Sequence, residues 1–221
     1  MFELEMKIEV DSKLLVQLGK FFTPIVLGIS VLWVVGFLLD ESLRVRFWSL
    51  CAGYFFPPLG KESIIPTGIA LGINPLLMGL SIAFIDIVVA LFLVWNYDLA
   101  KKIPLVGRFM VKVENIGRSS SEKYSWVKPL RFIGIVLFVM VPFQGSGSLV
   151  GSILGRLIGM KPWNTFLAIS IGTVSGCLLI ACFADVMKSV FVKNFLLGLL
   201  ILVILIVIVI IVFIYRKTKK N

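Results

Sequence analysis

The chain has 221 residues, of which 59% are hydrophobic and 15% charged, and its formal net charge is +10 at pH 7. Because soluble domains are far less apolar, the composition indicates an all-α integral membrane protein. The sequence contains no histidine, which excludes Ser-His and Cys-His catalysis and any His-ligated metal. The three cysteines lack metal-ligand spacing. Neither a metal site nor a cofactor is therefore expected.

The N-terminal segment precedes any long apolar stretch. Residues 2–10 alternate apolar and polar side chains, which predicts a strand-like arm that pairs with another subunit or lies on the membrane. Its acidic residues do not fit a cleaved signal peptide. We expect residues 1–20 to hold this arm and the start of the first helix, with a first full span over residues 21–39.

A short, interrupted apolar unit follows at about residues 47–74. The run from 48 to 56 is shorter than the roughly 20 residues that a membrane-spanning helix needs. Pro57, Pro58 and Gly60 break it, and a second short run follows. A short helix, a break and a short helix predict a re-entrant hairpin, in which the freed backbone groups are satisfied by protein or trapped water.

A second span is expected over residues 76–95, then a short surface helix over 104–117 and a polar connector to residue 128. A second interrupted unit follows at about residues 131–161, where the break contains Pro142, Gly145 and Gly147. A shift of 87 residues superimposes four residues of the first unit on the second: Gly60 on Gly147, Gly68 on Gly155, Gly72 on Gly159 and Pro75 on Pro162. Paired interrupted segments in two halves of a membrane protein indicate a transporter-like repeat.

The remaining apolar stretches predict a third span over residues 163–183 and a last span over 195–215, which ends in a basic tail. The expected architecture is therefore about four transmembrane helices and two re-entrant hairpins. Residues 21–195 form the transporter-like domain, and residues 195–221 form an anchor and tail.

The distribution of basic residues predicts the orientation. Eight Lys or Arg residues lie in the connector 101–131 and four in the tail, against two each in the segments 40–46 and 185–193. Cytoplasmic loops carry the excess of Lys and Arg. Both termini are therefore expected inside a prokaryotic plasma membrane. The first hairpin then enters from outside and the second from inside, which makes an inverted-topology repeat.

Asp86 lies near the centre of the second span, where a carboxylate is costly and is usually functional. Gly79, Ala83 and Ala90 share its helix face, so this face is expected to pack against a neighbouring helix. Two interpretations stay open. Asp86 is either a proton carrier or a protonated, hydrogen-bonded packing residue.

Four further charged or polar residues are candidates for the substrate or proton pathway. Glu62 either caps its own half-helix or acts as a gating or proton-binding carboxylate, and Lys61 beside it would meet an anionic head group. Gln144 and Ser146, with Ser148, place neutral polar groups at the second break, where they satisfy the broken backbone.

Arg156 has three alternatives: it pairs with Asp86 or Glu62, it binds a phosphate, or it extends to the cytoplasmic face. Ala168, Gly172 and Gly176 form a small-residue face that predicts close helix packing. No catalytic residue is expected.

The two breaks carry motifs that resemble those of the small multidrug export protein family. The first reads Pro57-Pro58-Leu59-Gly60-Lys61-Glu62, followed by Pro66-Thr67-Gly68, and the second reads Pro142-Phe143-Gln144-Gly145-Ser146-Gly147, followed by Gly151. The family's second motif typically reads Pro-Leu-Pro-Gly-Thr-Gly, so Gln144 replaces its second proline and Ser146 its threonine. The resemblance covers roughly residues 50–185.

That family is similar, at a distance, to the DedA/VTT membrane proteins. The resemblance implies two facing re-entrant hairpins and transport or scrambling of lipids, including polyprenyl-phosphate carriers, often coupled to protons. DedA-type proteins carry an arginine shortly after the proline of the second motif. Here Gly145 stands at about that position, and the nearest arginine is Arg156.

We therefore expect a membrane transporter of an amphiphilic substrate (a lipid, a polyprenyl-phosphate-like carrier or a hydrophobic drug-like molecule), coupled to protons. An energy-independent scramblase and a non-transporting scaffold are the alternatives, and an enzyme is not expected. The expected partners are membrane lipids, protons and the substrate, and no nucleic acid. Homo-oligomerisation stays open.

Overall fold

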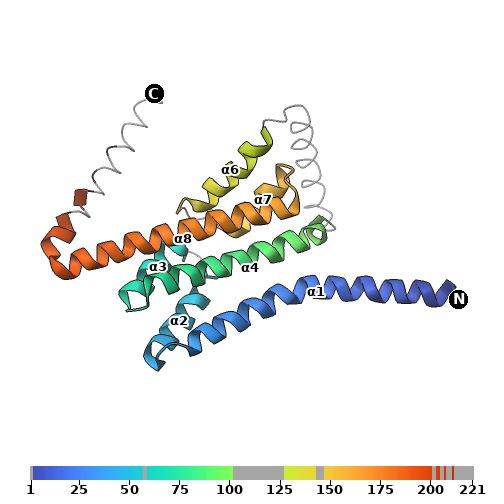
Figure 1. Ribbon diagram of the computed structural model, residues 1–221, viewed down its shortest axis with the longest axis horizontal. Helices are drawn as coiled ribbons and strands as arrows, with labels where there is room; N and C mark the ends of the chain where they lie inside the picture. The colour runs from blue at the N-terminus through green and yellow to red at the C-terminus, as the bar shows by residue number, and fades with distance from the viewer. Residues whose placement is uncertain are drawn as a thin grey trace.

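The computed structural model describes residues 2–56, 59–101, 127–142 and 147–200, and residues 203, 204, 207 and 211 beyond them. Side chains are described from residue 15 onward within these ranges, except at 98–101 and 127–129. The described chain is helical, and no strand occurs in it, as the composition predicts. Its helices are α1 (Phe2–Phe37), α2 (Glu41–Gly53), α3 (Lys61–Ala70), α4 (Pro75–Lys101), α6 (Val127–Met140), α7 (Ser148–Leu157) and α8 (Pro162–Lys193) (Figure 1).

Three of the described helices contain segments that are long and apolar enough to cross a membrane: Leu15–Phe37, Pro75–Tyr97 and Pro162–Lys193. They correspond to the first three predicted spans. The predicted last span over 195–215 and the surface helix over 104–117 lie largely or wholly outside the described residues.

The predicted N-terminal strand is wrong, because α1 begins at Phe2 and runs without interruption into the first span. A lone strand leaves its backbone groups unpaired, whereas a helix pairs them within the segment. The segment also contains Glu, Leu, Met and Lys, which are good helix formers. An alternation over only nine residues does not outweigh these two effects.

The offset of 87 residues found in the sequence also relates the helices. It relates the ends of α2 and α6, both ends of α3 and α7, and the starts of α4 and α8 at Pro75 and Pro162. Proline favours the first turn of a helix, where its missing N–H has no partner to lose. The helices α2, α3 and α4 therefore correspond, in the same order, to α6, α7 and α8.

The turns after α3 and α7 also correspond. Gly72 (φ 97°) and Gly159 (φ 81°) both adopt the left-handed backbone conformation. In each turn the next amide bonds back to the carbonyl five residues earlier at 3.0 Å, from Ile73 to Gly68 and from Met160 to Gly155. This is a Schellman cap, which needs a residue with positive φ and so favours glycine.

The corresponding helices α4 and α8 pack against each other in opposite directions (Figure 1). Gly79, early in α4, lies so close to Ala181, late in α8, that a Cβ on the glycine would be 3.0 Å from it. Ala90, later in α4, shares a buried cluster with Ala168 and Ile169 from the first half of α8. The prediction that the Asp86 face of α4 meets a neighbouring helix is confirmed.

The small-residue face of α8 packs against α6, which confirms the predicted close contact. A Cβ on Gly172 would lie 2.5 Å from the carbonyl oxygen of Val136, and one on Gly176 would lie 2.6 Å from that of Met140. Only residues without a Cβ let the two backbones approach so closely.

Candidate functional site

Asp86 is almost fully buried, with 2% of its surface exposed, in the middle of α4. Three hydroxyl groups donate hydrogen bonds to its carboxylate. Tyr54 and Ser148 donate to Oδ1, both at 2.8 Å, and Thr173 donates to Oδ2 at 2.7 Å. We call these four residues the Asp86 cluster.

The members of the Asp86 cluster come from four different segments. Tyr54 directly follows α2, Ser148 is the first residue of α7, and Thr173 lies in the middle of α8. A buried carboxylate is costly unless hydrogen bonds replace its lost water, and three hydroxyl donors provide this. The cluster therefore joins both halves of the chain through one titratable group.

Lys61 is also buried, with 2% exposed, at the first position of α3. Its Nζ donates to the carbonyl oxygen of Val139 in α6. The offset of 87 relates Lys61 to Ser148, so the first half places an ammonium where the second half places a hydroxyl. Within the described part of the chain, Lys61 and Asp86 do not form an ion pair with each other.

Glu62 folds back over the N-terminus of its own helix. A Cβ on Gly60 would lie 2.3 Å from Oε1 of Glu62, so the carboxylate occupies the space that the glycine leaves. The backbone amide of Gly60 donates to Ser63 Oγ at 3.1 Å instead. Oε1 of Glu62 is buried and has no hydrogen-bond partner among the described residues. Ser63, rather than Glu62, therefore caps α3.

Arg156 lies away from the Asp86 cluster. Its guanidinium donates to the carbonyl oxygen of Met160 at 3.0 Å and stacks 4.6 Å from the ring centroid of Tyr97. Tyr97 follows Asp86 by three turns of α4, about 16 Å along the axis. Of the predicted alternatives, pairing with Asp86 or Glu62 does not occur, because the hydrogen bond of Arg156 is to the turn that follows its own helix.

The remaining predicted site residues are only partly described. Gly60 and Gly147 are the N-cap residues of α3 and α7, and Pro142 follows the end of α6. The other break residues and two of the polar candidates lie outside the described residues: Pro57, Pro58, Gln144, Gly145 and Ser146.

Two members of the cluster, Tyr54 and Thr173, do not stand out in the sequence. The sequence does contain a signal for Thr173, because the shift of 87 residues that relates the two interrupted units places Asp86 on Thr173. Tyr54 is the last aromatic hydroxyl before the first break, and no periodicity indicates where it points.

An apolar cavity of about 570 Å³ lies between α1 and α4. We call it the α1–α4 cavity. Four of its lining residues come from α1, five from α4, and the last two from the start of α7 and the segment after α2: Ile25, Gly28, Ile29, Leu32, Ile85, Val88, Val89, Phe92, Leu93, Leu149 and Phe55. None of these side chains is polar.

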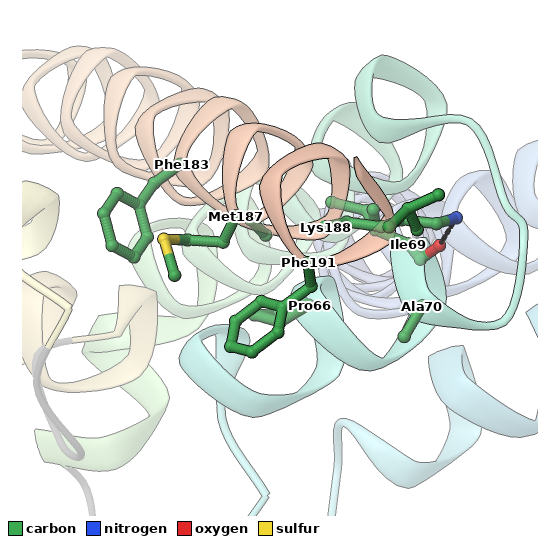
Figure 2. A pocket seen from close by; sticks show the side chains of 9 residues that line it. Pro66, Ile69, Ala70, Phe183, Met187, Lys188 and Phe191 are labelled. Carbon is green, nitrogen blue, oxygen red and sulfur yellow. Dashed lines mark hydrogen bonds between the residues drawn. The ribbon is translucent and has the colours of Figure 1, made fainter. Parts of the chain in front are cut away.

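A second groove, of about 550 Å³, lies between α3 and the C-terminal part of α8 (Figure 2). Phe183, Met187 and Phe191 line its α8 side, and Pro66 lies on its α3 side. Lys188 is its charged member, and Lys188 donates to the carbonyl oxygen of Ile69. No member of the Asp86 cluster lines either pocket, but Phe55, Ile85 and Leu149 of the α1–α4 cavity directly adjoin cluster members in the chain, whereas no residue of this groove does. The α1–α4 cavity is therefore the better candidate for a substrate site.

A family model with the description "Putative small multi-drug export protein" matches residues 63–179, which is more than half of the chain. The matched range contains α4, α6 and α7 and extends into α8, and it includes three members of the cluster: Asp86, Ser148 and Thr173. It begins just after Lys61 and Glu62. No curated protein and no solved structure matches the chain.

Proposed function

The chain belongs to the small multi-drug export protein family, and we propose that it is a transporter that moves an amphiphilic substrate across the membrane in exchange for protons. The observation that carries this proposal is the Asp86 cluster. Its carboxylate is buried at the centre of an apolar helix, is bonded by neutral hydroxyls, and joins both halves of the chain.

A carboxylate in these surroundings is suited to bind and release a proton. Hydroxyl groups donate to the charged form and accept from the neutral form, so Tyr54, Ser148 and Thr173 accommodate both states of Asp86. Titratable groups inside a membrane bundle typically belong to proton or substrate pathways. In the proposed cycle, Asp86 carries the proton in one direction and is deprotonated when it meets the substrate.

We further propose that the two halves form an inverted-topology repeat, in which the α2–α3 and α6–α7 pairs are re-entrant hairpins. The common offset of 87 residues and the opposite directions of α4 and α8 support this arrangement. The charge distribution supports cytoplasmic termini. With the last span, such a protein has four transmembrane helices, and substrate sites of this architecture lie at mid-depth between the repeats.

An energy-independent scramblase is the second candidate, because the α1–α4 cavity is apolar and would admit a lipid chain. A scramblase has no need for a titratable group, so it would equilibrate lipids without a proton gradient. A non-transporting scaffold is the third candidate, and it would assemble with partners through the N-terminal segment.

Flux measured in proteoliposomes tests the proposal. Purified full-length protein is reconstituted, and the movement of a fluorescent amphiphile is followed with and without an imposed pH gradient. Net accumulation against the substrate gradient, dependent on the pH gradient, is the expected result. Equilibration of the amphiphile that does not depend on the pH gradient would support the scramblase instead. Absence of flux for both lipid and hydrophobic-cation probes would contradict transport altogether.

A further inference from the structure

Three residues that line the α1–α4 cavity are chain neighbours of Asp86 cluster members. Phe55, Ile85 and Leu149 line the cavity, and each is the immediate neighbour of a cluster member: Tyr54, Asp86 and Ser148. A molecule that fills the cavity therefore contacts residues directly next to the two donors and the acceptor of the hydrogen bonds at Oδ1 of Asp86.

The cavity opens to the outside of the helix bundle. Ile29, Phe55 and Leu149, all lining residues, are 63%, 61% and 53% exposed, respectively. The α1 residues that line it fall in the middle of the apolar segment Leu15–Phe37, which would place them at mid-membrane depth. Its volume lies within the roughly 300–1,000 Å³ usual for small-molecule sites. An apolar body can therefore enter sideways from the bilayer.

The Asp86 carboxylate, next in the chain to the lining residue Ile85, favours one kind of polar group on the occupant. Asp86 is bonded to hydroxyls alone, and the buried ammonium of Lys61 is bonded to the carbonyl of Val139. A cation gains by exchanging one of these neutral donors for an ion pair with the carboxylate, whereas an anion would be repelled.

We propose that the α1–α4 cavity is the substrate site and that its substrate is a lipophilic cation that enters laterally from the membrane. The apolar body occupies the cavity, and contact with Phe55 and Leu149 moves Tyr54 and Ser148 away from Oδ1 of Asp86. The cationic group then takes their place. This inference rests on the proposed transport function and adds to it the site, the route and the charge of the substrate.

Calorimetric titration of the full-length protein in detergent, with protein-free micelles as the blank, tests the inference. The probes are the tetraphenylphosphonium cation and the tetraphenylborate anion, which have the same shape and opposite charge. Ile29→Trp fills the cavity from α1. Val26→Trp is the matched control, because Val26 is a similarly exposed residue of α1 (59%) that does not line the cavity.

The wild type is expected to bind the cation at least about tenfold more tightly than the anion. Ile29→Trp is expected to weaken cation binding by about tenfold or more, Val26→Trp to leave it within about twofold, and Asp86→Asn to remove the preference for the cation. Equal binding of the two ions, an unchanged Ile29→Trp variant, or no binding of the cation would each overturn the inference. Ile25→Trp, which enters the same cavity from the previous turn, serves if Ile29→Trp unfolds.

The titration separates this inference from the function on which it rests, because it measures binding without flux. Flux that persists in Ile29→Trp would refute the α1–α4 cavity as the substrate site without contradicting the proposed transport function. Cation binding that depends on the cavity, without any flux, would refute transport and leave the site standing.

Discussion

The hydrogen bond from Thr173 to Asp86, at 2.7 Å, joins two residues that are 87 positions apart, the same offset that relates α3 to α7 and the start of α4 to that of α8. The two residues therefore occupy the same place in their respective halves. Because α4 and α8 run in opposite directions, corresponding residues meet only where the helices cross. Corresponding positions of α4 and α8 thus supply the carboxylate and one of its hydroxyl donors.

Removal of this hydroxyl is expected to destabilise the protein. Thr173→Val keeps the shape of a fully buried side chain and removes a donor to a carboxylate, a change worth about 1.5–3 kcal/mol. Thr165→Val is the matched control, since Thr165 is equally buried in α8 and donates to the neutral carbonyl of Lys161. Thermal unfolding in detergent should show the larger decrease in Tm for Thr173→Val. Equal decreases would contradict the special role of this bond.

The contact between α6 and α8 predicts a contrast among glycines. Gly172→Ala places a Cβ 2.5 Å from a backbone carbonyl oxygen of α6. A backbone atom cannot move aside as a flexible side chain can, so we expect the free energy of unfolding to decrease by about 1–3 kcal/mol. Gly134→Ala, within α6, meets nothing within 4 Å and should be neutral or stabilising. Unfolding measurements on the two variants check this, and a neutral Gly172→Ala would show that the helices are further apart.

The two Schellman caps predict equal effects at corresponding positions. Alanine at Gly72 or Gly159 would have to adopt a positive φ, at a cost of about 1–2 kcal/mol in each case. Gly53→Ala is the control, because its Cβ would make only ordinary contacts, at 3.6 Å and beyond. Comparison of the three Tm values tests the prediction. A harmless substitution at either turn would argue against the left-handed conformation there.

Lys61 is expected to contribute to function more than to stability. Lys61→Met removes a buried charge that bonds to a single carbonyl, so the recovered cost of burial should offset the lost bond to within about 1 kcal/mol. Flux should nevertheless decrease if this ammonium lies on the substrate or proton pathway. Lys188→Met, at the groove between α3 and α8, is the control that should retain flux. A large decrease in Tm for Lys61→Met would instead assign Lys61 a structural role.

The sequence predicts the long helices well because hydropathy determines them directly. The spans beginning near residues 21, 76 and 163 all correspond to described helices, and the correspondence of α2–α4 with α6–α8 follows glycines and prolines that the turns require. Asp86 stands out because a carboxylate in an apolar helix is costly. These features depend on local composition, which a single sequence contains.

The partners of these residues depend on tertiary contacts and are harder to predict. The long side chain of Arg156 could reach several acceptors from one backbone position, and in the structure it donates to Met160. Tyr54 is one of many aromatic residues near a break, so its bond to Asp86 has no sequence signal. The N-terminal alternation was misleading because nine residues fit a strand period as well as a helix.

The most direct test of the central claim is proton-driven flux in proteoliposomes for Asp86→Asn beside the wild type. Asparagine keeps the size of the side chain and can bond to the same hydroxyls, but it does not titrate. Asp185→Asn, which changes an exposed carboxylate of α8, is the control. We predict that Asp86→Asn loses flux driven by the pH gradient while Asp185→Asn keeps it. Undiminished gradient-driven flux in Asp86→Asn would contradict the assignment of Asp86 as the coupling residue.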